Sequence, residues 1–323
     1  MEIYITSSDG TFNATKYCTT VSISGDYSRC VRTLEFGIMS NALDSNIPVI
    51  KCELGNGVVV MEDGVEIFNG YIFSREKLTG KSEITLTCFD RGIYIKRNEA
   101  VYKFSGKTPE AAVARICADF GITCGDVAST GISISRKFIG VKLVDIISTM
   151  YTLASQQNSK KYLIRFDGAK LCVIERGTDS VATLDGTYNL TKSTTSESIE
   201  NMINCVVVYD KDGNLLNTFK NADAISSYGL LQSYLRQGDE DVSQEAKKTL
   251  ADNDVTQKIT VENFGDKLCI TGNAITVKEP YTGVYGLFNI DSDVHTWKKG
   301  QYYNKLVINF KQIMSEKESG SDD

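Results

Sequence analysis

The single histidine, His295, limits the catalytic chemistry open to this chain of 323 residues. A helical His-Glu-x-x-His zinc site needs two histidines and is therefore impossible. A Ser-His-Asp or Cys-His arrangement would have to use His295, yet no Gly-x-Ser-x-Gly nucleophile motif accompanies it. His295 lies close to the only tryptophan, Trp297, in a strand-like run. We therefore interpret His295 as a structural side chain.

The nine cysteines do not have the spacing of a metal site. Zinc sites cluster their thiolate and imidazole ligands, but no pair here has Cys-x-x-Cys spacing, and the closest pair, Cys117 and Cys124, is seven residues apart. Several cysteines fall in strand-like runs, where a free thiol packs as a small hydrophobe. We predict buried, reduced thiols throughout, at Cys18, Cys30, Cys52, Cys88, Cys117, Cys124, Cys172, Cys205 and Cys269.

Two segments resemble the end of a phosphate-binding loop, Gly80-Lys81-Ser82 and Gly106-Lys107-Thr108. The leading glycine of such a loop would stand at positions 75 and 101, which hold Arg75 and Val101. We interpret both segments as turns. The sequence thus assigns no catalytic, cofactor-binding or metal-binding residue and no cofactor, and it names no interface residue. A chain of this kind is better suited to making contacts than to catalysis, and we predict that it is not an enzyme.

Charge and hydropathy exclude further classes of protein. The formal net charge is −6, and the last nine residues, 315–323, carry four acids and one lysine. Without a basic stripe, nucleic-acid binding is not expected, and no apolar run reaches the ~18 residues of a membrane span. The first residues have neither a basic start nor an apolar segment, so we expect synthesis and folding in the cytosol. Residues 315–323 are predicted to form an acidic flexible tail.

The first part of the chain, residues 1–102, is predicted to be β-structure. Strands at 58–61 and 65–68 flank Glu62-Asp63-Gly64, which is a hairpin signal. Residues 82–90 alternate apolar and polar side chains. Five Asp-Gly steps occur in the chain, a density typical of antiparallel sheets with tight turns.

A small α+β domain is predicted over residues 103–178. Thr108-Pro109-Glu110 has the residues of a helix start, and Gly121 those of a helix end. A second helix follows between Leu143 and Ala154. Strands at 162–166 and 170–174 then form a hairpin.

Residues 179–314 are predicted to return to β-structure, with helices at about 223–252 that carry Leu231, Tyr234 and Leu235. One unit recurs in both β regions. Gly70–Phe73 leads through a polar link to the strand 83–89, and Gly286–Ile290 leads through another to the strand 302–310. The predicted fold is mainly β with an α+β insertion, in which two similar antiparallel β-barrel-like domains flank a small α+β domain.

The order and spacing of several short motifs resemble those of the hub protein of contractile phage-tail baseplates, in the XkdQ/YqbQ branch related to late control protein D. The resemblance covers nearly the whole chain. It rests on the helix Thr108–Gly121, Ser198–Tyr209 (SIENMINCVVVY), a helix with YGLLQ at 228–232, Ala246–Leu250, Ile270–Asn273, and Gly286–Phe288 through His295–Trp297 to Gly300–Tyr302.

The resemblance implies a structural role in a contractile phage tail or a phage-tail-like particle, including prophage, tailocin and other contractile injection systems. Family members form a trimeric ring that adapts the sixfold tail tube to the threefold central spike. The implied partners are two further copies of the chain, tail-tube or tube-initiator proteins, the spike, and LysM-type and other baseplate proteins. The implied location is the virion baseplate. No appended peptidase or lysozyme domain is found.

Two alternatives of other classes stay open. One is a tail-associated peptidoglycan hydrolase that uses paired carboxylates, because sequence spacing says nothing about the spatial separation of the 41 acidic residues. The other is a carbohydrate-binding surface module with exposed aromatic side chains, for which 16 tyrosines but only one tryptophan are available.

Overall fold

The computed structural model describes residues 1–40, 49–238 and 241–322. The chain divides into two compact units. Unit 1 comprises Met1–Ser193 and Thr260–Asp323, and unit 2 comprises Thr194–Ile259. The predicted boundaries at 102/103 and 178/179 remain a prediction. Among the described helices, none is long and apolar enough to cross a membrane.

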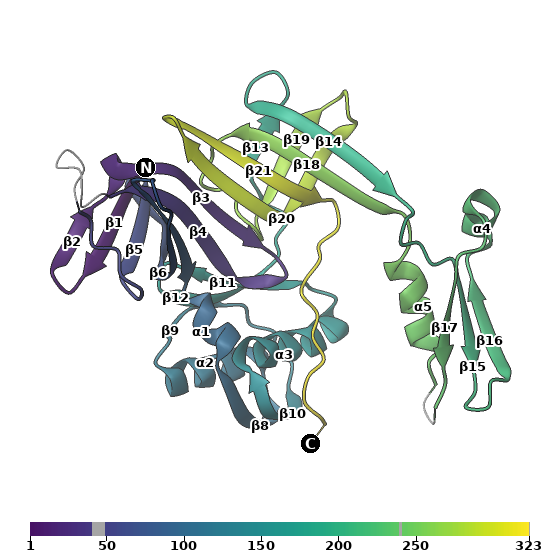
Figure 1. Ribbon diagram of the computed structural model, residues 1–323. Helices are drawn as coiled ribbons and strands as arrows, with labels where there is room; N and C mark the ends of the chain where they lie inside the picture. The colour runs from purple at the N-terminus through teal and green to yellow at the C-terminus, as the bar shows by residue number, and fades with distance from the viewer. Residues whose placement is uncertain (41–48, 239–240, 323) are drawn as a thin grey trace. The chain divides into compact units, whose positions relative to one another are not determined.

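A sheet of 13 strands dominates the fold, which confirms the mainly β prediction (Figure 1). Its strand order is β14-β18-β21-β20-β3-β4-β7-β6-β5-β1-β2, with β19 on β20 and β13 on β19. The strands are β1 (Glu2–Ser7), β2 (Gly10–Asn13), β3 (Cys18–Asp26), β4 (Arg29–Met39), β5 (Gly57–Glu62), β6 (Val65–Lys77), β7 (Glu83–Asp90), β13 (Ser180–Asp185), β14 (Leu190–Ser198), β18 (Thr256–Phe264), β19 (Ala274–Glu279), β20 (Val284–Lys298) and β21 (Gln301–Asn309). A short 3-10 helix, η1 (Thr15–Tyr17), precedes β3.

The two β regions share one topology. The N-terminal region has the order β3-β4-β7-β6-β5-β1, and the C-terminal region has the order β14-β18-β21-β20-β19-β13. Each strand of one region has its counterpart at the same place in the other, both in the sheet and along the chain. Most of unit 2 lies between β14 and β18, where the N-terminal region has the short connection from β3 to β4. One difference is that β1 runs antiparallel to β5, whereas β13 runs parallel to β19.

The predicted strand–link–strand repeat is present in both regions. The pairs β6–β7 and β20–β21 are antiparallel hairpins. Each long strand has a register shift, between Ile72 and Ser74 in β6 and between Ile290 and Ser292 in β20. The prediction of two similar β regions is therefore confirmed, and the similarity extends to the register shift in each long strand.

The regions are not closed barrels. Within the described part of the chain the sheet has three ends, at β2, β14 and β13, and the two regions form one continuous sheet. The reason lies in β20, which is 15 residues long. Its first part pairs with β19, and beyond the register shift the same strand pairs with β3.

The predicted α+β insertion follows β7. Thr108 caps α2 by accepting a hydrogen bond from the Ala111 amide, and Gly121 ends that helix in the left-handed conformation at φ 63°. The local signals at 108–110 and 121 are thus confirmed. The elements are α1 (Gly92–Arg97), β8 (Glu99–Lys107), α2 (Pro109–Phe120), β9 (Thr123–Val127), β10 (Ile134–Lys142), α3 (Leu143–Asn158), β11 (Tyr162–Asp167) and β12 (Lys170–Glu175).

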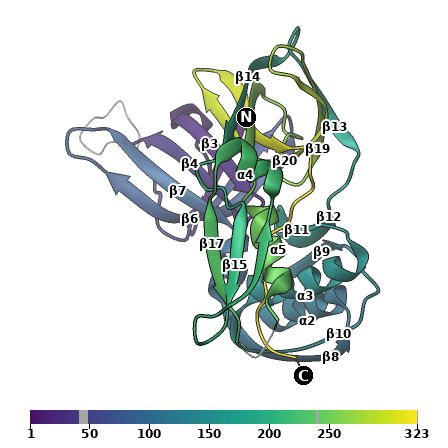
Figure 2. The ribbon, with the colours of Figure 1, turned by 90° about the vertical axis from the view of Figure 1, so that its right-hand side faces the viewer.

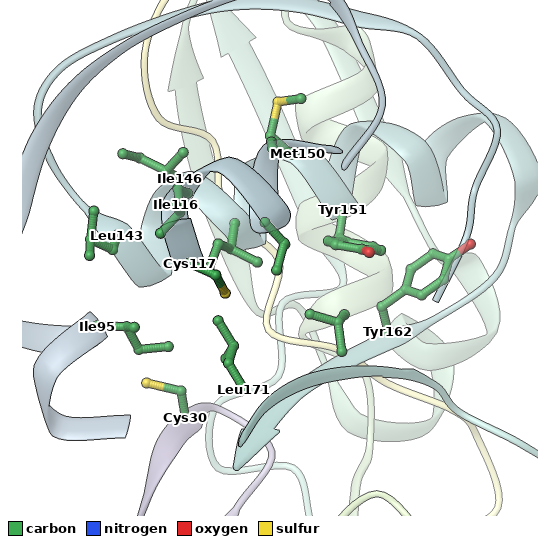
Figure 3. Close-up of a cluster of buried hydrophobic side chains, with 14 of the residues drawn as sticks. Cys30, Ile95, Ile116, Cys117, Leu143, Ile146, Met150, Tyr151, Tyr162 and Leu171 are labelled. Carbon is green, nitrogen blue, oxygen red and sulfur yellow. The ribbon is translucent and has the colours of Figure 1, made fainter. Parts of the chain in front are cut away.

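One apolar core joins the insertion to the N-terminal strands. Side chains from α1, α2, α3 and β12 meet Cys30 of β4 in this cluster (Figure 3). Burial in the core raises the pKa of Cys30 and Cys117 to about 12, so both stay as neutral thiols. The prediction of buried thiols is wrong for Cys124, which is exposed on β9, and Cys18 is only half-buried. β9 is an edge strand of the sheet β11-β12-β9, and none of its residues is fully buried.

The C-terminal segment differs from the predicted flexible tail. The amides of Lys317 and Ser319 donate to the hydroxyls of Thr152 and Thr149 on α3, at 3.1 Å each. Arg136 of β10 bonds the carbonyl oxygens of Ser319 and Gly320 and the carboxylate of Asp322. Figures 1 and 2 show the chain end beside β8 and β10. Most of these hydrogen bonds use backbone groups of the segment, so its polar side-chain composition did not indicate that it would pack against the insertion.

Unit 2 is a small sheet with the order β16-β15-β17, packed against one helix. Val206 and Val208 of β15 meet Ala246 of α5, while β17 runs parallel to β15 (Figure 2). Helices α4 and α5 fall in the predicted interval, but Leu235, assigned there to a helix, lies in a strand. The predicted YGLLQ helix ends at Tyr228. The elements are β15 (Cys205–Tyr209), β16 (Leu215–Lys220), α4 (Ala222–Tyr228), β17 (Gln232–Arg236) and α5 (Ser243–Asp252).

Candidate functional site

The seam between the two β regions is the most elaborate polar site of unit 1. We define the seam as the antiparallel pairing of β3 with β20, from Asp26 opposite Ser292 to Val21 opposite Trp297, with the side chains around it. Backbone pairing alone would leave the two regions free to slide in register. The side chains of the seam fix that register.

A fully buried carboxylate lies at the centre of the seam. Asp293 accepts from Arg32 Nη1 at 3.0 Å and Nη2 at 2.5 Å, and from the amide and hydroxyl of Thr271 at 2.7 and 2.6 Å. Burial alone would raise the pKa of Asp293, but Arg32 and His295 hold it well below its usual range. Asp293 is therefore a permanent anion whose partners come from both β regions.

Gly25 makes room for this ion pair. A Cβ at Gly25 would lie 2.4 Å from Arg32 Nη1 and 3.0 Å from Asp293 Oδ1. Glycine at this position therefore lets β3 approach the guanidinium closely.

His295 continues the network away from the ion pair. Its Nε2 lies 3.2 Å from Asp293 Oδ2, and its Nδ1 lies 2.7 Å from the Tyr302 hydroxyl. An aspartate–histidine–tyrosine chain has the outline of a catalytic relay. However, His295 is buried, and burial raises the pKa of Tyr302, so the phenol stays neutral. The arrangement holds the strands in place, in keeping with the structural role predicted for His295.

Trp297 closes the seam at the end where it pairs with Val21. Its indole stacks on Tyr302, with ring centroids 4.4 Å apart, and its Nε1 donates to Glu62 Oε2 at 3.0 Å. The α-amino group of Met1 pairs with the same carboxylate oxygen at 3.1 Å. Met1, which precedes β1, is thus tied to β5 and β20 at one point.

A second buried ion pair anchors the strand irregularity of β20. Asp291 is the residue skipped by the register shift, and its carboxylate accepts from Arg176 Nη2 at 3.0 Å. Arg176 also bonds the carbonyl oxygens of Ile290 and Ile313 at 2.9 and 2.6 Å. The link that leaves the α+β insertion is thereby fastened to the C-terminal β region.

The loops that resemble phosphate-binding loops do not come together in a site. Gly80, with φ 79°, lies in the turn between β6 and β7, as predicted. Gly106, with φ 57°, lies within β8, so its interpretation as a turn residue is wrong. Within residues 1–40, 49–238 and 241–322, no group of three or more histidine, cysteine, aspartate or glutamate side chains could hold a metal ion.

Sequence reasoning found His295 and Trp297 but missed Asp293 and Arg32. One signal was available, because Asp293, His295 and Trp297 alternate and therefore share a face of one strand. Arg32 is 261 residues away in the chain, and nothing local indicates that it pairs with Asp293.

Comparisons with known proteins agree with this architecture. The YQBQ-like family model matches residues 21–309. The phage-like element PBSX protein XkdQ of Bacillus subtilis (strain 168) is 24% identical over 308 residues, which cover 92% of this chain and 93% of XkdQ. The 43 kDa tail protein of prophage MuSo2 from Shewanella oneidensis has a similar fold, with a TM-score of 0.71 at 12% identity over 96% of this chain and 98% of that one.

A more distant likeness is to the E. coli protein c3393. It is described as a component of the type VI secretion system with structural similarity to the T4 tail proteins gp27 and gp5. The TM-score is 0.54 at 9% identity, over 94% of this chain and 76% of that one. Because the family model spans nearly the whole of the doubled β architecture and its insertions, the chain belongs to the YQBQ-like family.

Proposed function

We propose that this protein is the structural hub of the baseplate of a contractile phage tail or phage-tail-like particle. In this proposal three chains form a ring that joins a sixfold tail tube to a threefold central spike. The duplicated strand order carries the proposal. Three chains with two equivalent β regions each present six similar surfaces, which suits the sixfold tube. A surface that occurs once in each chain is present three times in the ring, which suits the threefold spike.

The seam suggests how such a ring closes. Within one chain, β3 pairs with the part of β20 that lies beyond its register shift. In the duplicated topology β14 is the counterpart of β3, and β6 is the counterpart of β20. A second seam of the same kind would therefore join β14 of one chain to β6 of the next. Three seams within chains would alternate with three between chains.

The strand edges needed for this second seam are open. On one side of β6, β5 pairs with residues up to Tyr71, so Ser74–Lys77 pairs only with β7 in the described structure. These four residues are exposed. β14 ends the sheet order, and most of its residues are exposed too. Open edges of this kind accept strands from other chains.

Paired cysteines can test the second seam. The starting variant carries Cys124→Ser, because Cys124 is an exposed thiol. Ser74→Cys is then combined in turn with Lys192→Cys, Thr194→Cys and Ser196→Cys, which lie at alternate positions of β14. We expect mild oxidation to give disulfide-linked multimers up to trimers on non-reducing gels for at least one pair.

The matched control combines Ser74→Cys with Thr218→Cys, which lies on the exposed strand β16 of unit 2. Equal cross-linking in the control, or none in all three pairs, would contradict the second seam. Native mass measurement of the protein, alone and with the spike protein, should show threefold stoichiometry. Strictly monomeric behaviour under both conditions would contradict the hub.

The proposed partners are tail-tube or tube-initiator proteins on the sixfold side, the spike on the threefold side, and LysM-type and other baseplate proteins around the ring. Support comes from the similarity to XkdQ, the MuSo2 tail protein and the E. coli type VI component. The proposed location is the baseplate of the particle, after synthesis in the bacterial cytoplasm. Co-expression with the genes encoded on either side, followed by affinity purification, tests these partners.

We also propose that the protein is not an enzyme. Among the carboxyl groups of the described residues, Asp90 is the one whose pKa burial raises to about 7, a value suited to acid catalysis near neutral pH. It is only 3% exposed, which keeps it from a polymer such as peptidoglycan. A zymogram on peptidoglycan should show no lysis. Lysis that is abolished by one aspartate or glutamate substitution would favour the hydrolase instead.

A further inference from the structure

A cavity of about 360 Å³ lies in unit 1 where five segments meet. Its walls come from the connection between β3 and β4, from α1, from the start of α3, from β11, and from the C-terminal segment. One wall is apolar, with Leu163, Ile164 and Met314. Cavities of this size are typical of small-molecule sites.

The cavity also gathers positive charge. Arg29, Lys96, Lys142 and Lys317 line it, and Asp145 is the one acidic residue among the lining residues. None of the four basic side chains forms a hydrogen bond or ion pair within the described ranges. These basic residues come from four different segments, so the fold itself brings them together. An anionic ligand would offset their mutual repulsion.

The start of α3 adds to this positive field. The helix has 16 residues, and its N-cap residue is Lys142. A lysine side chain has no hydrogen-bond acceptor, so it cannot cap the amides of the first turn. A cation at the positive end of a helix is unfavourable, whereas an anion there is stabilised by the exposed amides and the helix dipole. Asp145 stands in this first turn and offsets part of the positive charge, and the Leu143 amide donates to the Asn98 carbonyl oxygen. The four basic side chains outnumber that one carboxylate, so the cavity still favours an anion.

Ser148 gives an independent indication of a ligand. It lies on α3 four residues after Val144, lines the cavity and is 6% exposed. Its hydroxyl has no hydrogen-bond partner in the part of the chain that the structure describes. The side chain is almost wholly buried, but its hydroxyl oxygen is open to the cavity, so an oxygen of a ligand can bond to it.

We propose that this cavity binds a small phosphorylated organic molecule. The phosphate group lies beside the start of α3, where it accepts hydrogen bonds from Lys96, Lys142 and the Val144 amide, since the Leu143 amide already donates to Asn98. The organic part packs on Leu163, Ile164 and Met314. The cavity is much larger than one phosphate ion, which is why an organic part belongs to the ligand. This site is separate from the ring proposed above and needs only a single chain.

The test is isothermal titration calorimetry of the full-length protein at low ionic strength. Three probes are sn-glycerol 3-phosphate as a monoester, glycerophosphoglycerol as a diester, and inorganic phosphate; glycerol and a tetraglutamate peptide are controls. We expect saturable binding of the monoester or the diester, tighter than that of inorganic phosphate. Tighter binding of the monoester would indicate a free metabolite as the ligand, and tighter binding of the diester would indicate a unit of a phosphodiester polymer.

Three variants locate the site. Lys96→Gln with Lys142→Gln should weaken binding by about a hundredfold, and Ser148→Ala by about tenfold, since a hydrogen bond to a charged group is lost in each case. Lys16→Gln is the matched control, because Lys16 is exposed in η1 and does not line the cavity. Trp297 emission verifies that each variant is folded.

The proposal is wrong if neither ester binds, if tetraglutamate binds as tightly as the esters, or if Lys16→Gln weakens binding as much as the double variant. Because the titration uses the isolated chain, failure of the proposed trimer would leave this result intact, and failure of the cavity would leave the trimer intact.

Discussion

Breaking the buried ion pair of the seam should unfold unit 1 far more easily than removing both charges. In Arg32→Met, Asp293 keeps the hydrogen bonds of Thr271 but loses its guanidinium partner, while its carboxylate stays fully buried. Removing one partner of a buried pair costs about 3–5 kcal/mol. The double variant Arg32→Met with Asp293→Asn leaves a neutral amide, which still accepts from the Thr271 amide. We expect it to cost about 1–2 kcal/mol.

Trp297 makes the assay specific for the seam. It is the only tryptophan, it stacks on Tyr302, and it donates to Glu62, so its emission reports on the place where the β regions join. Urea unfolding followed by this emission gives the free energy of unfolding of each variant. A loss below about 1 kcal/mol for Arg32→Met, or a double variant less stable than the single one, would refute our account of the seam.

Three further predictions follow from single side chains. Burial raises the pKa of Asp90 to about 7, so ionisation of this carboxyl group lowers the stability of the fold as the pH rises from about 4 through 7, and Asp90→Asn should therefore stabilise the protein by up to about 4 kcal/mol at pH 8 and have little effect at pH 4. Urea unfolding at both pH values measures the two effects, and equal effects would contradict the prediction. Gly70→Ala should cost about 2–3 kcal/mol, since its Cβ would lie 2.2 Å from the Phe89 carbonyl oxygen, whereas the control Gly57→Ala meets nothing closer than 3.7 Å and should change stability by less than about 1 kcal/mol. Cys124 should react fastest with a thiol reagent in the native protein, and nine thiols should react after denaturation; a Cys124→Ser variant that keeps the fast phase would disprove the assignment.

Features of the fold that depend on neighbouring residues were predictable. The turn at Asp63-Gly64 has φ angles of 48° and 73°, as its residue types indicate, and it joins β5 to β6 as expected. The helix start at Thr108 and the helix end at Gly121 are equally local. Each of these signals lies within a few residues of the structure that it specifies.

Features that depend on distant partners were not predictable. Leu231, Tyr234 and Leu235 have helical spacing, yet β17 forms because it can pair with β15. In that strand Leu235 packs against the core of unit 2, while Tyr234 is 69% exposed, so the two side chains face opposite ways. Spacing alone could not separate the two outcomes, because pairing with a distant strand decided between them.

The same limit applies to the seam. The repeat of strand, link and strand was visible in the sequence and indicated two related β regions. Their fusion into one sheet depends on the length of β20 and on the pairing of Arg32 with Asp293, which no local pattern encodes. The duplication could therefore be inferred from the sequence, but the contact between the duplicated parts could not.

The position of unit 2 in the duplicated topology leads to a last prediction. Residues 199–255 of unit 2 form an insertion between β14 and β18, whose counterparts β3 and β4 are joined by two residues, Tyr27 and Ser28. The ends of β14 and β18 are close, since Gln257 Nε2 donates to Glu197 Oε1 at 3.3 Å and Ser196 Oγ to the Lys258 carbonyl oxygen at 3.4 Å. A tight turn can therefore replace the insertion without moving either strand.

We expect a variant with Asn-Gly in place of residues 199–255 to keep the Trp297 emission and the urea midpoint of unit 1. If the hub proposal holds, it should also keep threefold stoichiometry, because the second seam uses the strands and not the insertion. A matched variant with Asn-Gly in place of Tyr27 and Ser28 controls for the turn itself. A deletion variant that folds but is monomeric would show that unit 2 carries the contact between chains, and the six similar surfaces would then not be what closes the ring.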